Sequence, residues 1–230
     1  MIRFNKNNIE TPKWATLNVA VSMGKDSVAL SHFLCSGYRK LKLIHVNHGT
    51  PYSQEAETAF IEYVHYLNTE RRWRREAGEE VTLIEYAVMR YSNKVKLKSE
   101  SDFRNVRYKL FSTALEDTRD EEIVVCHHLD DCVESYLMNC LNGHADFMPI
   151  PTRTNRGNYT VIRPFVADTE RSDINNYVRD KCLNDHIVED PSNEDITIRR
   201  NWLRCVIIPQ IRQQYPGINT IVRKKLKVAN

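Results

Sequence analysis

The stretch LNVAVSMGKDS, residues 17–27, places a short apolar and partly β-branched run directly before a turn of small and polar residues. A helical pattern follows from Asp26 onward. A strand that passes through such a turn into a helix is typical of the first half of a βαβ unit. The unpaired N–H groups and the positive dipole end at the start of that helix favour an anion above the turn. The stretch therefore indicates a parallel α/β domain that binds a phosphate.

The same alternation of strand and helix patterns continues along the chain. Four short apolar runs have the composition of strands buried on both faces, and segments with apolar residues at helical spacing lie between or after them. The predicted strands are residues 17–21, 41–46, 81–86 and 123–126, and the predicted helices are residues 26–34, 53–68, 102–115 and 130–141. This pattern predicts an α/β fold, doubly wound, with a mainly parallel sheet and helices on both faces. In such folds ligands bind beyond the carboxyl ends of the strands, where the segments following each strand converge.

The amino-acid composition of the sequence changes after Gly143. Residues 148–159 are rich in Pro, Thr, Asn and Gly, which predicts a loop. Helices are predicted for residues 169–182 and 194–213, and Pro216 begins a basic helical tail. We assign residues 1–145 to a nucleotide-binding α/β core and residues 146–230 to a loop and a C-terminal helical segment that complete the same domain.

The composition is that of an ordinary folded protein. The 230 residues include 33 Lys plus Arg and 30 Asp plus Glu, a formal charge of +3, and 41% of them are hydrophobic. These values exclude collagen-like, low-complexity and disordered chains. No apolar run approaches the roughly 18 residues of a membrane helix. We therefore expect a cytoplasmic protein with no membrane partner.

The chain has six cysteines and no C-x-x-C pair. In a chain of this size the cysteines favour reduced, mostly buried thiols over a disulfide framework. The missing C-x-x-C pairs remove the usual zinc-ribbon and thioredoxin-like signatures and weaken an iron–sulfur interpretation.

The turn Ser22-Met23-Gly24-Lys25-Asp26-Ser27 is the first candidate site. Its serines and Lys25 supply donors for a phosphate, and Asp26 has the oxygen ligands that magnesium prefers. The alternative is an ordinary N-cap turn in which Asp26 satisfies the helix donors. The turn matches neither the Walker A loop nor the dinucleotide fingerprint.

The second candidate is the run CHHLDDCVE, residues 126–134, at the end of the fourth predicted strand. Asp131 and Glu134 are three residues apart and share one helix face. Two carboxylates in a phosphate-binding crevice require magnesium or a substrate ammonium to balance them. In the alternative, the histidines cap strand ends and the acids face water. Zinc ligation by Cys126, His127 and Cys132 lacks a fourth ligand at a familiar spacing.

Arginine pairs form the third and fourth candidates. Arg104 and Arg107 share a helix face just before Tyr108, and Arg200 and Arg204 are four residues apart. Surface solvation accounts for such pairs in most proteins. Their place near the predicted crevice favours contact with phosphate or RNA.

The segment 70–80 clusters four arginines and four glutamates around Trp73. A solvated helix end or loop explains this composition. The alternative is a nucleic-acid contact, because arginine and an aromatic ring together meet phosphate and stack on a base. With a net charge of only +3, RNA affinity would depend on local clusters such as residues 71–75.

Taken together, these segments resemble the tRNA(Ile)-lysidine synthetase family of PP-loop enzymes, which belongs to the N-type ATP pyrophosphatases. The family pattern consists of S-G-G-x-D-S (residues 22–27 here), H-V-[ND]-H-G (45–49), R-x-x-R-Y (104–108), H-H-x-D-D-x-x-E-[TS] (127–135), R-P-[FL] (163–165), D-P-S-N-x-D (190–195) and R-N-x-[LI]-R (200–204). The blocks occur in order over roughly residues 17–216, and Met23 departs from the pattern by replacing the first glycine.

The resemblance implies a PP-loop, adenine nucleotide α-hydrolase-like fold and a ligase that forms a C–N bond. Such an enzyme adenylates the C2 carbonyl oxygen of the wobble cytidine of tRNA(Ile), which carries a CAU anticodon, and releases pyrophosphate. The ε-amino group of L-lysine then displaces AMP and leaves lysidine. ATP is the co-substrate and Mg²⁺ the cofactor.

The resemblance also implies a role for individual residues. ATP binding falls to Ser22, Met23, Gly24, Lys25, Asp26, Ser27 and His48, magnesium to Asp26 and Asp131, catalysis to Asp26, Arg104, Asp131, Glu134, Asn193 and Arg204, and tRNA or phosphate contact to Arg107, Arg163 and Arg200. Asp131 and Glu134 would hold the lysine ammonium, and Asp131 would help to form the neutral amine.

Two other functions remain open from the sequence. One is a different PP-loop adenylating enzyme, for thiolation or amidation, although relatives that thiolate tRNA usually show C-x-x-C pairs. The other is a nucleotide- or RNA-binding module without turnover. Family members commonly carry C-terminal domains that help to recognise tRNA, and we expect these to be absent from a chain that ends at Asn230.

Overall fold

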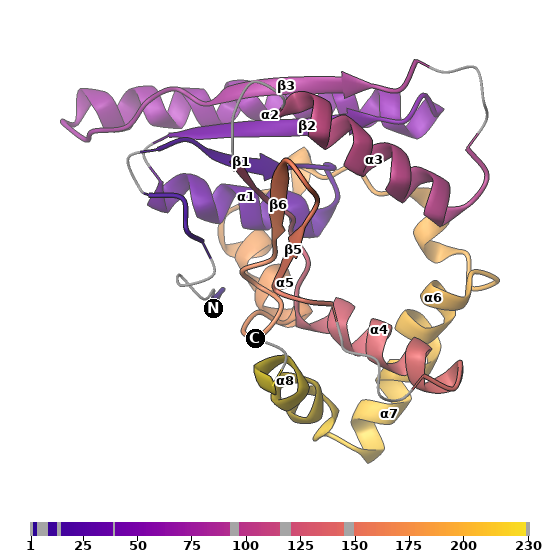
Figure 1. The fold of residues 1–230 in the computed structure, drawn as a ribbon. Helices are drawn as coiled ribbons and strands as arrows, with labels where there is room; N and C mark the ends of the chain where they lie inside the picture. The colour runs from indigo at the N-terminus through magenta and orange to yellow at the C-terminus, as the bar shows by residue number, and fades with distance from the viewer. Residues whose placement is uncertain are drawn as a thin grey trace.

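The computed structural model describes residues 2–3, 9–12, 15–38, 40–92, 97–115, 121–144 and 150–228. Within them, six strands form one sheet in the order β3-β2-β1-β4-β6-β5 (Figure 1). The strands are β1 (Leu17–Ala20), β2 (Leu41–Asn47), β3 (Glu85–Arg90), β4 (Glu121–Val124), β5 (Arg153–Asn155) and β6 (Tyr159–Ile162). All neighbouring pairs are parallel except β5 and β6. The predicted mainly parallel sheet is confirmed.

Helices connect the strands and continue after β6. They are α1 (Lys25–Gly37), α2 (Pro51–Glu76), α3 (Glu100–Ala114), α4 (Leu129–Leu141), α5 (Arg171–Asp180), α6 (Arg199–Trp202), α7 (Ile208–Gln214) and α8 (Ile218–Val228), with the 3-10 turns η2 (Asn184–His186) and η3 (Pro191–Glu194) and the π-helical segment η4 (Leu203–Ile207). No described helix has the length and apolar character needed to span a bilayer.

The helices cover both faces of the sheet. On one face, Leu30 of α1, Phe60 of α2 and Ile174 of α5 pack in one core with β1 and β2. On the other face, Phe111 of α3 packs against strand residues such as Ile123. Figure 1 shows α2 and α3 on opposite sides of β2 and β3. The doubly wound prediction is therefore confirmed.

A separate apolar cluster holds the C-terminal helices. Leu129 and Val133 of α4 pack with Ile208 of α7 and with Val222 and Leu226 of α8. Figure 1 shows α4, α7 and α8 side by side below the sheet. This cluster fixes α4 and α7 relative to each other, and thereby positions the short helix α6 that precedes α7.

The third strand lies further along the chain than predicted. Residues 81–84 are outside β3 because side chains of α2 bind their backbone groups. Arg71 donates to the Thr82 carbonyl at 2.7 Å, and Asn68 accepts from the Ile84 N–H at 2.7 Å. The ladder with β2 begins only at Glu85, which pairs with Lys42.

The loop predicted for residues 148–159 is described from residue 150 onward, and the prediction is partly wrong there, because β5 and β6 form an antiparallel hairpin. The turn uses Gly157, which has a φ of 91°, and Asn155 Oδ1 accepts from its N–H at 2.7 Å. The helix predicted for residues 194–213 starts later, at Arg199, and is interrupted by η4.

Met23, at the turn after β1, has a left-handed backbone with a φ of 67°, and its side chain is fully buried in the core of α1, α2 and α5. A left-handed conformation costs a residue with a Cβ about 1–2 kcal/mol. Because the side chain is buried in this core, it does not lie over the turn, and its burial offsets the backbone cost.

We expect Met23→Ala to lower the free energy of unfolding by about 2–5 kcal/mol, because it leaves a cavity and keeps the backbone cost. Met23→Gly leaves a similar cavity but relieves the left-handed backbone, so its loss should be smaller by about 1 kcal/mol. Urea unfolding of both variants tests this order. Equal losses would show that the backbone at residue 23 is not strained.

Candidate active site

The turn of residues 22–27 joins β1 to α1 and is held by its own serines. Ser27 Oγ accepts from the Ser22 N–H at 3.1 Å and donates to the Gly24 carbonyl at 2.9 Å. Gly24 is the N-cap of α1 and has no side chain to satisfy the first-turn N–H groups. The turn therefore presents free backbone donors and a positive dipole end, as an anion site requires.

The backbone conformation of residue 24 does not require a glycine. Its φ of −69° is open to any residue, and a Cβ at this position would lie 3.7 Å from Ser22 Oγ, an ordinary contact. The bare Cα leaves the surface above the turn open to close approach by a ligand.

His128, the N-cap residue of α4, is the centre of the acidic part of the site. Its Nε2 lies 3.4 Å from Asp26 Oδ2 and 3.5 Å from Asp131 Oδ2, and its Nδ1 lies 3.5 Å from Asp130 Oδ2. Burial alone would lower the pKa of His128, but the carboxylates outweigh it and raise the pKa to about 10. These contacts join the turn after β1 to the start of α4.

Asp130 and Asp131 are both ionised. Burial would raise the pKa of each carboxyl, but His128 and nearby arginines lower it well below the usual range. Asp131 Oδ2 also accepts from the His128 N–H at 3.0 Å, and Arg212 of α7 lies 2.7 Å from Asp130 Oδ1.

Glu134, one helical turn further along α4, is buried among three arginines. Arg204 Nε and Arg200 Nε lie 2.6 Å and 3.0 Å from its two carboxylate oxygens, and Arg171 lies at 3.4 Å. Arg200 also reaches Asp131 at 3.3 Å. The predicted pairing of Arg200 and Arg204 on one helix face is confirmed, and that face lies on the acids of α4.

Magnesium fits this set of donors. Asp26 and Asp131 each turn a carboxylate oxygen toward the same point beside His128. Magnesium commonly takes one or two carboxylates from the protein and its other ligands from substrate phosphates and water. No group of three or more His, Cys, Asp or Glu residues among the described part of the chain forms a site of protein ligands alone.

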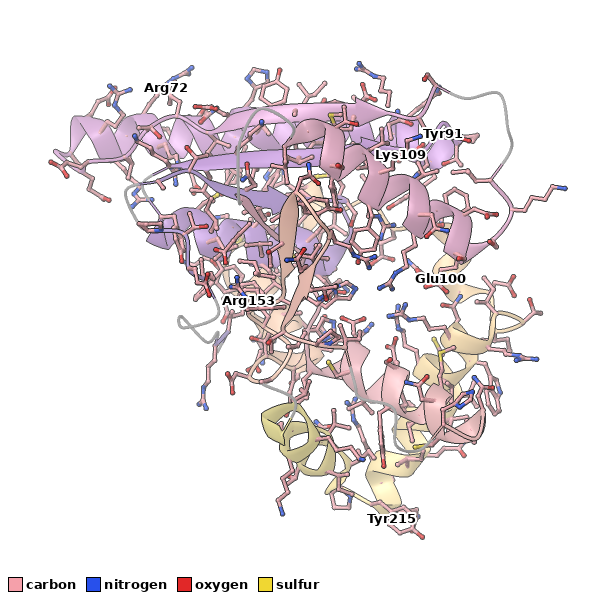
Figure 2. The ribbon with its side chains drawn as sticks, in the orientation of Figure 1. Arg72, Tyr91, Glu100, Lys109, Arg153 and Tyr215 are labelled. Carbon is pink, nitrogen blue, oxygen red and sulfur yellow. The ribbon has the colours of Figure 1, made fainter. Side chains whose placement is uncertain are left out.

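The arginines of α3 lie beside the same region. Figure 2 shows Glu100 at the α6 side of α3, where its carboxylate contacts Arg200 at 2.9 Å. One turn further along α3, Arg104 is exposed and stacks on the Tyr108 ring at 5.3 Å. Burial lowers the pKa of Arg107, and the charges of Arg104 and Arg200 act in the same direction. Cations from α3 and α6 thus crowd one region.

Arg163 lies inside the protein, unlike the exposed Arg104. It is buried and donates to the Pro151 carbonyl at 3.0 Å, to Thr154 Oγ1 at 2.9 Å and to the Tyr108 hydroxyl at 3.4 Å. These contacts tie the β5–β6 hairpin to α3. In this structure the side chain serves the fold and presents no surface to a phosphate.

His48 and His127 are neutral. Burial, aided by the charge of Arg107, lowers the pKa of His48 to about 4, and its ring packs edge-on against Phe103. Burial lowers the pKa of His127 to about 3. His48 therefore contributes a hydrogen-bonding ring and no charge.

The cysteines near the acids are inert thiols. Burial raises the pKa of Cys126, and it raises the pKa of Cys132 to about 12. Their sulfurs contact the carbonyls of Ala20 and Ile150, each at 3.8 Å. The raised pKa values and these contacts argue against zinc ligation by Cys126, His127 and Cys132.

Asn193 lies in η3, in a fully exposed segment. This segment is connected to the turn after β1, because the Val188 N–H donates to the Met23 carbonyl at 3.0 Å and Glu189 lies 3.8 Å from Lys25. The structure thus brings the chain around Asn193 to the same turn as Lys25.

The segment 70–80 is helical through Glu76, at the end of α2. Arg71 is buried, whereas the Trp73 side chain is 64% exposed. Figure 2 shows Arg72 at one end of the molecule and Tyr91 near the other. Tyr91 follows β3 and so marks the carboxyl end of the parallel strands, which is the end where the turn after β1 and the start of α4 lie. The segment is therefore not part of the site around His128.

Three site residues were not singled out from the sequence: His128, Arg171 and Arg212. The H-H-x-D-D motif contains His128, but only burial among three carboxylates makes it a cation. Arg171 and Arg212 belong to no quoted motif, and their roles depend on how α5 and α7 pack beside α4.

Comparison with known proteins gives consistent matches. The profile of the PP-loop domain family matches residues 2–211. A tRNA(Ile)-lysidine synthase of Deinococcus deserti is 31% identical over 211 residues, which are 92% of this chain and 37% of that protein. That of Geobacillus kaustophilus is 32% identical over 89% of this chain and 43% of its own length. The chain thus spans less than half the length of these two relatives.

Among solved structures, the U34-tRNA thiolase NcsA from Methanococcus maripaludis with its [4Fe-4S] cluster superposes with a TM-score of 0.69. The alignment covers 97% of this chain and 74% of NcsA at 15% sequence identity. At this identity the likeness shows the fold alone.

We expect Glu134→Gln to lower the free energy of unfolding by about 3 kcal/mol, because the partly buried arginines lose the charge that compensates them. Glu100→Gln is the matched control: it removes an exposed partner of the same Arg200 and should change stability by no more than about 0.5 kcal/mol. Urea unfolding at pH 7 measures both, and similar small losses would contradict the structural role of Glu134.

The neutral His48 should make stability depend on acid pH. Its pKa is about 4 in the folded protein and near 6.5 when unfolded, so only the unfolded chain takes up this proton between those values. Stability then falls as the pH drops, with a slope of up to about 1.4 kcal/mol per pH unit from this residue. His48→Phe keeps an aromatic ring but cannot take up a proton. The stability of this variant relative to the parent should therefore rise as the pH falls from 7 to 5. A difference that stays constant with pH would contradict this assignment.

Proposed function

This chain belongs to the PP-loop domain family, whose members are ATP pyrophosphatases, and we propose that it converts the wobble cytidine of tRNA(Ile) to lysidine with ATP and L-lysine. The observation that carries the proposal is the meeting of the turn after β1 with the acids of α4 at His128. An anion site and a cation site thereby lie next to each other. The relatives named tRNA(Ile)-lysidine synthase support the choice of substrates.

The turn of residues 22–27 binds the ATP phosphates in this proposal. The first N–H groups of α1 and the hydroxyl of Ser22 donate to phosphate oxygens, and Lys25 adds a positive charge. Gly24 permits the close approach. Magnesium held by Asp26 and Asp131 would neutralise phosphate charge and orient the leaving pyrophosphate.

The reaction proceeds in two steps. The C2 carbonyl oxygen of the cytidine attacks the α-phosphorus of ATP, and the bond from that phosphorus to the bridging oxygen breaks to release pyrophosphate. The lysine ammonium gives a proton to water, its neutral ε-amino nitrogen attacks C2, and the C2–O bond breaks to release AMP. The nitrogen then gives a second proton to water. Both steps depend on positioning and on balancing charge, which this set of acids and arginines supplies.

Asp131 and Glu134 hold the ammonium of lysine, and Arg200 and Arg204 face phosphate or the activated cytidine. In this structure the two arginines contact the two acids directly. The lowered pKa of Asp131 suits it to hold the ammonium and not to accept its proton. ATP phosphates that draw the arginines away would free the acids for lysine.

The tRNA lies along α3 and η3 in this proposal. Arg104 is exposed for contact with the RNA backbone, and Arg107 lies next to it. Asn193 lies in an exposed segment that begins at the nucleotide-binding turn. Because the chain spans only part of its relatives, its tRNA contacts are proposed for these elements alone.

Thiolation is the second candidate, since the fold resembles that of a tRNA thiolase. The buried thiols near the site have raised pKa values and serve poorly as nucleophiles or metal ligands. The described residues also offer no group of three or more metal-ligating side chains. These observations favour lysine over sulfur as the incoming group.

The test is incubation of the protein with ATP, magnesium, radiolabelled lysine and unmodified tRNA(Ile) with a CAU anticodon, followed by nuclease digestion. We expect labelled lysidine, with AMP and pyrophosphate in equal amounts. Asp26→Asn should reduce pyrophosphate release at least a hundredfold, because it removes a proposed magnesium ligand. Asp180→Asn, an exposed change on α5, is the matched control and should keep full activity.

The other outcomes would change either the function or the residues assigned to it. AMP and pyrophosphate formed on the tRNA without labelled lysidine would replace lysine by another nucleophile. ATP binding without AMP on any tRNA would favour the non-catalytic binding module. Full activity of Asp26→Asn would remove Asp26 from the mechanism.

A further inference from the structure

The segment that carries Asn193 is exposed at every residue from Pro191 to Arg199, and residues 191–194 form the 3-10 turn η3. One buried side chain, Asn201, holds it. Asn201 Nδ2 donates to the Ser192 carbonyl at 2.7 Å and to the Asp195 carbonyl at 3.0 Å. Both protons of a single amide therefore bind the two carbonyls on either side of Asn193.

The other end of the segment is fixed to the nucleotide-binding turn. The Val188 N–H donates to the Met23 carbonyl at 3.0 Å, and the Tyr52 hydroxyl donates to the Val188 carbonyl at 3.1 Å. A carbonyl of the turn after β1 is thus bound to the chain two residues before Asp190. The segment is attached at both ends, and Asn201 supplies the second attachment.

Asn201 also lies next to the ion pairs of the site. Its neighbour Arg200 contacts Asp131 and Glu134, so α6 is placed on the acids of α4. Any displacement of α6 would move the two carbonyl bonds of Asn201 with it. The position of the segment is therefore fixed relative to both the phosphate-binding turn and the acids of α4.

We propose that Asn201 is a positioning residue, which holds the segment 190–195 so that Asn193 meets the adenylated cytidine. The proposal rests on the proposed function, but its structural part does not. Ser192, Asn193 and Asp195 have N–H groups bonded within the segment, to Asp190 Oδ1 and to the carbonyls of Asp190 and Ser192. These amides report directly on whether the segment is held.

The first test is hydrogen exchange on Asn201→Asp in the full chain, without ATP or RNA. The carboxylate has nearly the shape of the amide but donates no hydrogen bond and repels both carbonyls. Each lost bond is worth about 1 kcal/mol, so exchange over residues 190–197 should accelerate about tenfold or more. Asn176→Asp, the same chemical change at an exposed position of α5, is the control and should leave this exchange unchanged. Unchanged exchange in Asn201→Asp overturns the proposal.

The second test is the steady-state rate of AMP formation on the tRNA. Asn201→Asp should lower kcat about tenfold and change the Kd for ATP less than twofold, since the phosphate-binding turn is intact. If Asn201 acts through Asn193, the double variant Asn193→Ala/Asn201→Asp should be no slower than Asn193→Ala. Additive losses, or full activity of Asn193→Ala, would overturn the positioning role. Asn201→Ala replaces Asn201→Asp if the buried carboxylate prevents folding.

The two tests separate the two claims. Faster exchange in Asn201→Asp together with a parent protein that forms no AMP on any tRNA would refute the proposed reaction while supporting the anchoring by Asn201. An active parent with unchanged exchange in the variant would support the reaction and refute the role of Asn201.

Discussion

Two carboxylates on the first turns of α4, Asp131 and Glu134, are buried, and a buried charge is tolerated only beside its counter-charge. The counter-charges come from Arg200 and Arg204, which lie 66 and 70 residues beyond Glu134 in the chain. The structure therefore depends on this pairing: it draws α6 onto α4, and the segment before α6 onto the turn after β1. Without the acids the arginines would lose the buried charges that they pair with, and without the arginines the acids of α4 would be buried without counter-charges.

The π-helical segment η4 is the device that keeps the arginines aligned. In a regular α-helix every fourth residue advances about 40° beyond a full turn, so from Arg200 to Arg212 a stripe would drift by about 120°. The wider turn of η4, which includes Arg204, takes back part of this drift, and Arg200, Arg204 and Arg212 all reach carboxylates of α4. Pro209 accounts for its place, because proline has no N–H for the bond to the carbonyl four residues earlier.

Local patterns predicted the parts of the fold that depend on local physics. The strand, turn and helix around residues 17–34 and the i,i+4 arginines were accessible because periodicity and spacing determine them. The start of β3 was not, because Arg71 and Asn68 of α2 bind the backbone that strand propensity would have paired with β2. The charge of His128 and the burial of Arg163 were also inaccessible, since each depends on side chains brought together from several elements. The motif marked where chemistry is concentrated, and packing decided which of its residues carry charge.

The charge balance of the site connects this architecture to substrate binding. The carboxylates of Asp26, Asp130, Asp131 and Glu134 face Arg171, Arg200, Arg204, Arg212 and a charged His128, so four negative groups meet five positive ones. In the proposed reaction, the ATP phosphates and the lysine ammonium would exchange partners with the internal pairs, the phosphates with the arginines and the ammonium with the acids. In the protein as described, the internal ion pairs compensate these buried charges.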